Sequence, residues 1–282
     1  MALAGAVELS PGLVMPRFGL GLWGPREGLE TERAVAAALE AGYRLFDSAP
    51  VYQNEKSLGR ALLASGLKRE QYFIISKLWT VGRENFEPVE DLKRSLDNLG
   101  LDQLDLCLLH WPTPQSSRAW LSLGETLATG LIRALGVANF SPSQLTRLVA
   151  ETGLWPRLWQ MEIHPLRTQE ALLEAARAQG VALMAHCPLA RGRLRKNQIL
   201  GRLAQKHRRS VAQIILRWAW QRGLAVIPKS TQPERIRENA RIFDFDLPPA
   251  DVAAISRLDQ GQSVLKPPFV FDAAGYVLAH SR

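Results

Sequence analysis

Residues 42–55 read Gly-Tyr-Arg-Leu-Phe-Asp-Ser-Ala-Pro-Val-Tyr-Gln-Asn-Glu, and they hold a strand end, a loop and a helix start. The apolar pair Leu45 and Phe46 predicts a buried strand that stops at Asp47. After the loop, Asn54 is placed to cap a helix that begins at the next residue. Polar loop residues often serve only the backbone, so the rest of the chain must decide whether this stretch is a site.

The same order of strand, short loop and helix repeats along the whole chain. Short apolar runs occupy residues 18–22, 44–46, 73–76, 104–109, 132–137, 158–161, 181–185 and 224–227. Stretches with helical periodicity occupy residues 29–39, 55–64, 89–99, 118–128, 142–149, 169–179, 211–221 and 233–240. Continuous apolar strands that alternate with helices are typical of a parallel sheet covered by helices. The pattern predicts an α/β fold in which residues 1–282 form a single (β/α)8 barrel domain. We also expect an N-terminal β-hairpin over residues 7–15 and a C-terminal tail, residues 261–282, near the barrel mouth.

The composition is that of a globular protein with a large core, since 46% of the 282 residues are hydrophobic and 22% are charged. No apolar run reaches the length of a membrane span, and the first residues lack the basic region of a signal peptide. Cys107 and Cys187 have neither the spacing of a disulfide framework nor that of a zinc site. We therefore expect a cytoplasmic protein with no membrane partner, no disulfide and no metal.

The net charge of +8 is compatible with a nucleic acid or with a phosphorylated small molecule as partner. The densest basic stretch, residues 191–209, lacks interleaved aromatic residues and contains no recognisable nucleic-acid-binding motif. Net charge is evidence about partners and not about fold. We expect a solvated helix face in this stretch, arginines near a small anionic ligand, and no nucleic-acid partner.

Polar or aromatic residues follow each of the eight apolar runs. They are Trp23, Asp47, Tyr52, Lys77, Trp79, His110, Trp111, Asn139, Gln160, Glu162, His186, Lys229 and Ser230. Barrel enzymes place their active sites at the carboxyl ends of the strands. We therefore expect these side chains to converge on one mouth.

Four of these residues, Asp47, Tyr52, Lys77 and His110, form a set suited to proton transfer. A cation beside a phenol stabilises the phenolate, so Lys77 is expected to pull the pKa of Tyr52 below about 10, with Asp47 as counter-ion. Tyr52 would then donate a proton near neutral pH, and His110 can either hold the substrate oxygen or share the proton. An apolar pocket above this donor is expected from Trp23, Val51, Trp79 and Trp111. Because a proton donor alone reduces nothing, the chain should also bind a hydride source.

The last strand end carries the groups expected for a phosphate. Lys229, Ser230 and Arg235 offer two positive charges and a hydroxyl within seven residues. No G-x-G-x-x-G motif follows a strand, so no Rossmann-type cofactor site is expected. A barrel whose Lys77 or Lys229 forms a Schiff base, as in aldolases, is an alternative that uses the same residues.

Three blocks of the sequence resemble the aldo-keto reductase superfamily, and the match covers nearly the whole chain. They are residues 42–55, residues 105–112 (Asp-Leu-Cys-Leu-Leu-His-Trp-Pro) and residues 227–239 (Ile-Pro-Lys-Ser at the start, Arg-Glu-Asn at the end). The short loop after Pro114 is similar to the bacterial 2,5-diketogluconate reductase branch. The resemblance implies a (β/α)8 barrel, NADPH bound without a Rossmann fold, and reversible reduction of aldehydes or ketones to alcohols.

The resemblance also implies a role for each site residue. It implies Tyr52 as acid, Asp47 and Lys77 as its tuning pair, and His110 as substrate orienter. For the cofactor it implies the following residues: Asn139 and Gln160 on the nicotinamide amide, Leu189 and Arg191 over the pyrophosphate, Lys229, Ser230 and Arg235 on the 2′-phosphate, and Glu238 and Asn239 near adenine.

The chain departs from the family pattern at the nicotinamide site. Ala138 stands where members usually have serine, and Gln160 follows Trp159 where they often have asparagine. His186 occupies the position of the aromatic residue that stacks on the nicotinamide. We expect its imidazole to titrate near pH 6.5 and, when protonated, to weaken binding of the cationic oxidised cofactor.

The leading interpretation is an NADPH-dependent reductase that acts on a small-molecule carbonyl substrate, as a monomer by default for the family. A non-catalytic barrel that senses NADPH is a further alternative, because the fold alone does not exclude it. The four intact residues Asp47, Tyr52, Lys77 and His110 favour the enzyme.

Overall fold

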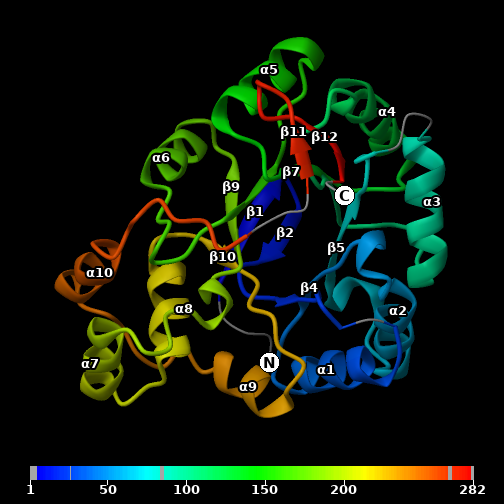
Figure 1. Cartoon of the computed structure of the whole chain (residues 1–282). Coiled ribbons are helices and arrows are strands. Elements are labelled where there is room, and N and C mark those ends of the chain that lie inside the picture. Colours follow the sequence, from blue (N-terminus) through cyan, green and yellow to red (C-terminus); the bar gives the residue numbers. More distant parts are fainter. Residues whose placement is uncertain (1–4, 26, 83–85, 266–268, 281–282) are drawn as a thin grey trace.

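The computed structural model describes residues 5–25, 27–82, 86–265 and 269–280. An eight-stranded sheet forms its centre, in the spatial order β10-β9-β8-β7-β6-β5-β4-β3, and every pair of neighbouring strands in this order is parallel (Figure 1). Its strands are β3 (Leu20–Gly21), β4 (Leu45–Asp47), β5 (Phe73–Leu78), β6 (Leu106–Leu109), β7 (Leu135–Ala138), β8 (Leu158–Glu162), β9 (Ala182–His186) and β10 (Ala225–Val226). A parallel bridge between Phe18 and Val226 joins the first strand to the last. The sheet is therefore closed into the predicted (β/α)8 barrel.

Helices surround this sheet at the predicted places, with boundaries that shift by a few residues (Figure 1). They are α1 (Leu29–Glu40), α2 (Glu55–Ala64), α3 (Pro88–Leu99), α4 (Ser116–Thr129), α5 (Pro142–Thr152), α6 (Glu170–Ala178), α8 (Val211–Gln221) and α9 (Pro233–Asn239). Short 3-10 turns are η1 (Pro50–Tyr52), η2 (Arg69–Gln71) and η3 (Ala190–Gly192). In the part of the chain that the structure describes, no helix is both long and apolar enough to cross a membrane.

Two further helices, α7 (Gln198–His207) and α10 (Pro249–Ser256), lie outside the predicted set. Helix α7 carries part of the basic stretch 191–209, and its residues Lys206 and His207 both contact the carboxylate of Asp251 in α10. The basic stretch is therefore a helix face, as expected, but one that is partly paired with a neighbouring helix.

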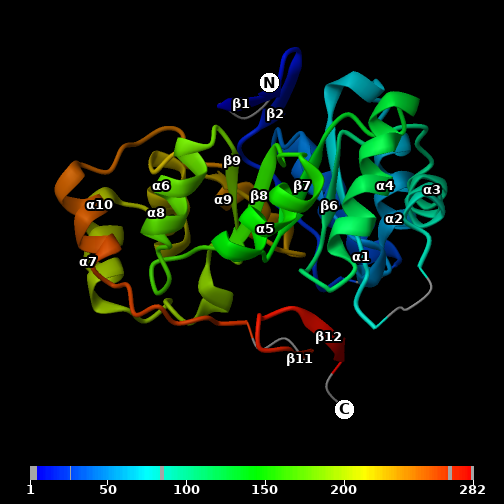
Figure 2. The ribbon, with the colours of Figure 1, turned by 90° about the horizontal axis from the view of Figure 1, so that it is seen from above.

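A hairpin lies at each end of the barrel (Figure 2). The N-terminal one joins β1 (Ala6–Ser10) to β2 (Leu13–Pro16), as predicted, and its Leu9 and Met15 pack on the apolar side chains inside the barrel. The C-terminal one joins β11 (Phe269–Phe271) to β12 (Val277–His280) at the opposite end, where the strands have their carboxyl ends. The predicted position of the tail near the mouth is confirmed for its described residues, 261–265 and 269–280.

Candidate active site

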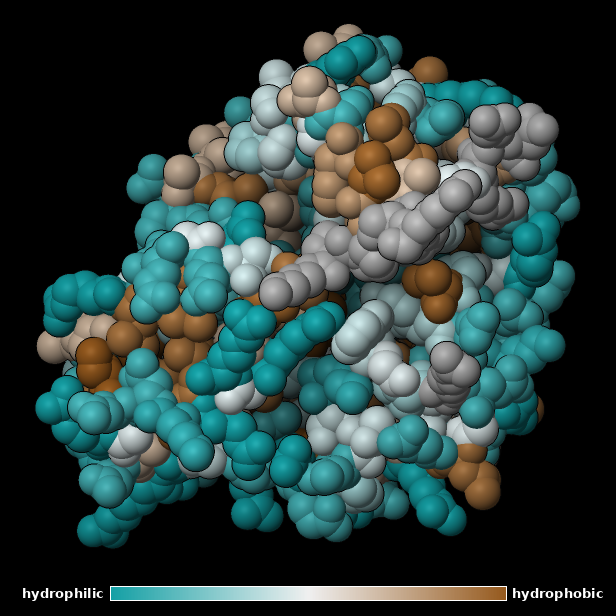
Figure 3. All heavy atoms as spheres, viewed as in Figure 1, coloured by the Kyte–Doolittle hydropathy of each residue, from teal (hydrophilic) through white to brown (hydrophobic). Residues whose placement is uncertain are grey.

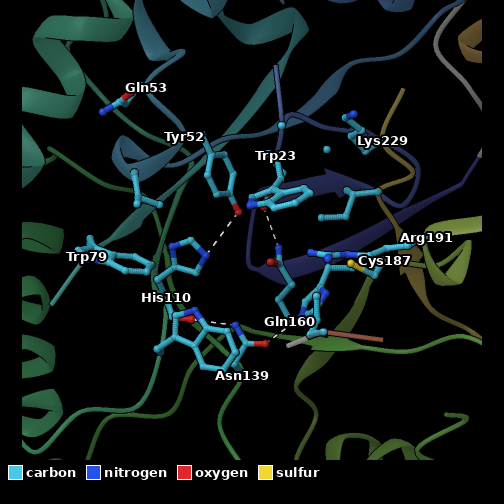
Figure 4. Close-up of a pocket in the computed structure, with 18 of the residues that line it drawn as sticks. Trp23, Tyr52, Gln53, Trp79, His110, Asn139, Gln160, Cys187, Arg191 and Lys229 are labelled. Atoms are coloured by element: carbon cyan, nitrogen blue, oxygen red, sulfur yellow. Dashed lines mark hydrogen bonds between the residues drawn. The ribbon is translucent and has the colours of Figure 1, made fainter. Parts of the chain in front are cut away.

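A cavity of about 680 Å³ opens at the carboxyl ends of the strands. The predicted residues in its lining are Trp23, Asp47, Val51, Tyr52, Trp79, His110, Trp111, Asn139, Gln160, His186, Arg191 and Lys229. Figure 4 shows the polar side chains at its floor and Lys229 and Arg191 to one side. The convergence expected from the strand-end rule is therefore observed.

The floor of the cavity holds a buried ion pair beneath a phenol. Lys77 comes from β5, is 2% exposed, and places its Nζ 2.5 Å from Asp47 Oδ1 of the neighbouring strand β4. The same ammonium donates to the carbonyl of Ser48 at 2.9 Å and lies 3.3 Å from the hydroxyl of Tyr52. Two charges removed from water are tolerated because each finds a partner at hydrogen-bond distance. Lys77, Asp47 and Tyr52 therefore meet as predicted.

The prediction that Lys77 lowers the pKa of Tyr52 is wrong. Burial of the phenol, followed by the negative charge of Asp47 and by Cys187, raises the pKa of Tyr52 well above 10. The ammonium of Lys77 does not reverse this, because Asp47 lies closer to it than the phenol does. Burial also lowers the pKa of Lys77 itself, against the opposing effect of Asp47. Tyr52 is thus a neutral phenol in the free protein, which is the form that can donate a proton.

His110 lies next to the Tyr52 hydroxyl (Figure 4). Its Nε2 lies 3.4 Å from that oxygen, and the ring of Trp79 packs edge-on against the imidazole. Burial and then the charge of Lys77 lower the pKa of His110 well below 6.5, so the ring is neutral. Among the described residues, its Nδ1 has no hydrogen-bond partner although the atom is buried.

Asn139, His186 and Gln160 form the wall next to this floor. Asn139 has a left-handed backbone (φ 65°), donates to the carbonyl of His110 at 2.9 Å, and places its Oδ1 2.9 Å from Nε2 of His186. Gln160 donates to Asp47 Oδ2 at 2.8 Å. Burial, which outweighs the opposing charge of Glu162, lowers the pKa of His186 to about 3. The expected titration of His186 near pH 6.5 is therefore wrong, because the ring is buried against an amide.

The loop that carries Tyr52 is held in place by the side chains of Asn54 and Glu55, which follow the loop. Asn54 stands at the predicted N-cap position of α2, but its side chain makes no capping bond. It donates instead to the carbonyls of Leu22 and Pro25 and accepts from the hydroxyl of Ser48. The next residue, Glu55, accepts at 2.6 Å from Ser76, the neighbour of Lys77 in the chain. Asn54 therefore joins the β3–α1 loop to the β4–α2 loop at the mouth rather than capping a helix.

The remaining predicted cofactor residues lie at or beyond the rim. Arg191 covers the ring of Trp23, with its guanidinium carbon 4.6 Å from the ring centre. Lys229 is exposed in the lining, whereas Ser230, Arg235 and Glu238 lie on the surface beyond it. Leu189 is partly buried against the hydrophobic core and Asn239 is buried, and neither is among the described residues that line the cavity.

Two residues of the C-terminal tail complete the pocket, and the sequence did not identify them. Leu265 and Phe269 belong to the lining, and the ring of Phe269 lies 5.0 Å from that of Trp111 and 5.9 Å from that of Trp79. The other unpredicted lining residues are Gly21, Gly24, Gln53, Cys187 and Ile227. The sequence showed only that a tail follows the last repeat. This predicted a tail near the mouth but not which of its residues contact the pocket.

A closed parallel barrel with a cavity at the carboxyl ends of its strands, lined by apolar walls and a few convergent polar groups, has the architecture of an enzyme. The model of the "Aldo/keto reductase family" matches residues 17–260. The methylglyoxal reductase DkgA of Yersinia pestis is 41% identical over 276 residues, which are 96% of this chain and 99% of that relative. The glyoxal reductase of Bacillus subtilis is 40% identical over 264 residues, 93% of this chain and 96% of that protein.

A solved structure is similar along nearly the whole chain. The aldo-keto reductase of Bombyx mori in complex with NADP matches with a TM-score of 0.85 at 35% identity, covering 94% of this chain and 96% of that one. The protein belongs to the aldo/keto reductase family. It is an NADP-dependent oxidoreductase that interconverts carbonyl groups and alcohols.

Proposed function

We propose that Tyr52 is the general acid of carbonyl reduction in this protein. The observation that carries the proposal is the position of its hydroxyl, 3.3 Å from Lys77 Nζ and 3.4 Å from His110 Nε2 at the floor of the cavity. A carbonyl oxygen placed beside that hydroxyl would receive its proton as negative charge develops. Lys77 then stabilises the phenolate that is left, and Asp47 keeps the ammonium charged and fixed.

The residues of the cavity fit NADPH. Its deep end offers the side-chain amides of Asn139 and Gln160, which suit a carboxamide, and its rim offers the basic groups of Lys229 and Arg191. Gly24 leaves the rim open next to Lys229, because a Cβ there would approach Cε of that lysine to 3.0 Å.

A ligand with an amide at one end and phosphates at the other matches this order of groups. We assign Asn139, Gln160 and His186 to the nicotinamide, Leu189 and Arg191 to the pyrophosphate, Lys229, Ser230 and Arg235 to the 2′-phosphate, and Glu238 and Asn239 to adenine.

When bound, NADPH supplies the hydride that reduces the carbonyl carbon. The chain supplies the other half of the reaction. His110, neutral and fixed by Trp79, offers a ring nitrogen on the side of the pocket where the carbonyl oxygen would lie. Trp23, Trp79 and Trp111 exclude water, which strengthens the electrostatic effect of Lys77 on the developing phenolate.

A Schiff-base mechanism is disfavoured by the same geometry. Lys77 Nζ lies 2.5 Å from a carboxylate and donates to a second acceptor, so it is held as an ammonium without a free lone pair. Lys229 is exposed at the rim of the cavity and is not desolvated as an activated lysine would be. Two curated relatives that bear the names of reductases of methylglyoxal and glyoxal further support small aldehydes as substrates.

The proposals for domain number, oligomeric state, compartment and partners come from the sequence. We propose a single-domain monomer that works in the cytoplasm on a free small molecule, without a nucleic-acid partner. Cys107 and Cys187 are both free thiols in the structure, which is compatible with a reducing compartment. Placement in the 2,5-diketogluconate reductase branch stays a prediction.

The test is the variant Tyr52→Phe, which deletes the proton donor and keeps the ring. We expect kcat for aldehyde reduction to fall by about a hundredfold to ten-thousandfold, since this is the usual contribution of general-acid catalysis. The Kd for NADPH, measured by quenching of tryptophan fluorescence, should stay within about twofold of the wild-type value. Wild-type turnover in Tyr52→Phe, under conditions where chemistry limits the rate, would refute the assignment.

A further inference from the structure

Glu162 is a buried carboxylate at the barrel mouth that the proposed chemistry does not use. It ends strand β8, is 4% exposed, and follows Gln160 by two positions. Side chains two apart in a strand point to the same face, so Glu162 projects towards the mouth as Gln160 does. A buried carboxylate is costly unless its oxygens are fully paired, so its partners indicate what it is for.

The partners of Glu162 come mainly from the C-terminal tail. Its Oε2 accepts from the hydroxyl of Ser263 at 2.5 Å, and its Oε1 accepts from the backbone amide of Val264 at 2.6 Å and from that of Leu265 at 3.3 Å. The imidazole Nε2 of His164 lies 3.0 Å from Oε1. These hydrogen bonds outweigh the opposing effect of burial and hold the pKa of Glu162 below its ordinary value.

The tail segment that Glu162 binds has no regular secondary structure to hold it. Residues 259–265 lie in neither helix nor strand, and the amides of Gln260 and Gln262 donate to the carbonyl of Leu166. Three successive residues, Ser263 to Leu265, then converge on the single carboxylate of Glu162. Further along the described part of the tail, the carbonyl of Ala274 accepts from Gln144 Nε2 at 3.1 Å, and the amide of Val277 donates to the carbonyl of Pro112 at 2.8 Å. Glu162 is thus the anchor where the tail enters the mouth.

The anchored segment contributes to the wall of the pocket. Leu265 itself lines the cavity, and Phe269 lines it four residues later between Trp79 and Trp111. Beyond Phe269 the hairpin leaves Val270, Phe271 and Leu278 on the surface, where Figure 3 shows a brown patch. Because this hairpin is only partly packed, the position of Phe269 depends on the fixed points that flank it.

We propose that Glu162 is a positioning residue for the substrate: its carboxylate fixes the tail so that Leu265 and Phe269 form the apolar wall facing Tyr52. The inference rests on the proposed function, since it assigns the substrate to that side of the cavity. Loss of the anchor should weaken binding of bulky apolar carbonyl compounds, which need the wall. It should affect small dicarbonyls little, because they reach Tyr52 without touching the wall.

The test compares 4-nitrobenzaldehyde with methylglyoxal as substrates of Glu162→Gln, which keeps the shape of the side chain and removes its charge. We expect KM for the aromatic aldehyde to rise roughly tenfold, in line with the loss of a charge-assisted hydrogen bond. KM for methylglyoxal and kcat for both substrates should change less than about twofold. Ser263→Ala, which removes one donor on the tail side only, should shift KM in the same direction by less. Glu90→Gln, the same chemical change at an exposed ion pair on α3, should shift neither.

A double-mutant cycle with Phe269→Ala separates positioning from a general defect. If Glu162 acts through the wall, Glu162→Gln should have little further effect on KM once Phe269 is truncated. Full additivity of the two changes would overturn the proposal, as would equal losses of kcat and kcat/KM with both aldehydes.

Amide hydrogen exchange gives a readout that does not depend on activity. Glu162→Gln and Ser263→Ala should both speed exchange at Val264 and Leu265, while β8 stays protected. If the wild type reduced no aldehyde with NADPH but exchange accelerated as expected, the proposed function would fail and the anchor would stand. Unchanged exchange at these two amides would overturn the anchor itself.

Discussion

At the residue scale, the ammonium of Lys77 lies closer to the carboxylate of Asp47 than to the hydroxyl of Tyr52. This difference explains why the phenol keeps its proton. Asp47 Oδ1 lies 2.5 Å from Nζ, whereas the Tyr52 hydroxyl lies 3.3 Å away. In the free protein the positive charge is therefore largely matched by the carboxylate, and Tyr52 keeps its proton. Stabilisation of a phenolate matters only when the proton leaves, so a raised pKa in the resting state is compatible with an acid role.

A binding measurement can test the charge of His186. Because burial lowers the pKa of His186 to about 3, the ring is neutral from about pH 5.5 to pH 8. A histidine with an ordinary pKa would become positive as the pH fell through about 6.5 and would then repel the cationic ring of NADP⁺. We therefore expect the ratio of the Kd values for NADP⁺ and NADPH to stay constant over this range. A ratio that rises at low pH in the wild type and stays flat in His186→Tyr would show that the ring is charged.

Which side chains meet at the floor of the cavity could be predicted from the sequence, but their pKa values could not. Asp47, Lys77 and His110 each stand where an apolar run ends, and parallel strands bring such ends together. The pKa values of Tyr52 and His186 depend on how much water the surrounding walls exclude. That exclusion is a property of the packed molecule, and no local pattern encodes it.

At the scale of elements, the loop between β4 and α2 is held by a side chain rather than by its own backbone. Asn54 is fully buried and bridges the carbonyls of Leu22 and Pro25 and the hydroxyl of Ser48. Asn54→Ala should lower the free energy of unfolding by about 2–4 kcal/mol, because each buried group left unpaired costs about 1–3 kcal/mol. Urea denaturation measures this, and Lys56→Ala, an exposed change in the same helix turn, is the control. A loss no larger than that of Lys56→Ala would contradict the bridging role.

Helix α9 carries the proposed contact to the 2′-phosphate. Arg235→Ala should raise the Kd for NADPH about tenfold to a hundredfold, since a hydrogen bond to a charged group is worth about 1.5–3 kcal/mol. The Kd for NADH, which lacks that phosphate, should stay nearly constant. Arg237→Ala is the matched control, because Arg237 lies on the same helix but pairs with Glu40. Equal losses for the two cofactors in Arg235→Ala would remove Arg235 from the phosphate site.

Elements that follow the strand–helix repeat were predicted, and those that interrupt it were missed. Helices α7 and α10 lie outside the repeat; α7 was interpreted only as a charged face because it falls in the basic stretch 191–209 and carries Arg202 and Lys206. The hairpin β11–β12 has short apolar runs of its own, but it follows the last strand–helix repeat, so the repeat does not predict its place. Its contacts with Trp79 and Trp111 are long-range, and sequence spacing does not predict them.

At the scale of the whole molecule, the barrel is closed by few contacts. Strands β3 and β10 contain only two residues each. Among the described residues, the backbone contacts across their seam include the Phe18–Val226 bridge and hydrogen bonds from Gly19 to Val226, from Val226 to Arg17 and from Gly21 to Pro228. The mouth spans this seam, because Gly21 and Ile227 both line the cavity. Closure of the barrel and integrity of the site therefore depend on the same short stretch.

The absence of a side chain at Gly21 allows the seam to close. A Cβ at this position would lie 2.9 Å from the carbonyl oxygen of Ile227, so one strand would have to move. Gly21→Ala should lower the free energy of unfolding by about 1–3 kcal/mol, the usual cost of overpacking. Gly201→Ala is the matched control: nothing lies within 4 Å of the added methyl group in α7, and alanine there should raise stability by about 0.5–1 kcal/mol. Urea denaturation of both variants measures the difference. If Gly21→Ala were as stable as the wild type while Gly201→Ala showed its expected gain, close approach of β3 and β10 would not be what limits closure of the barrel.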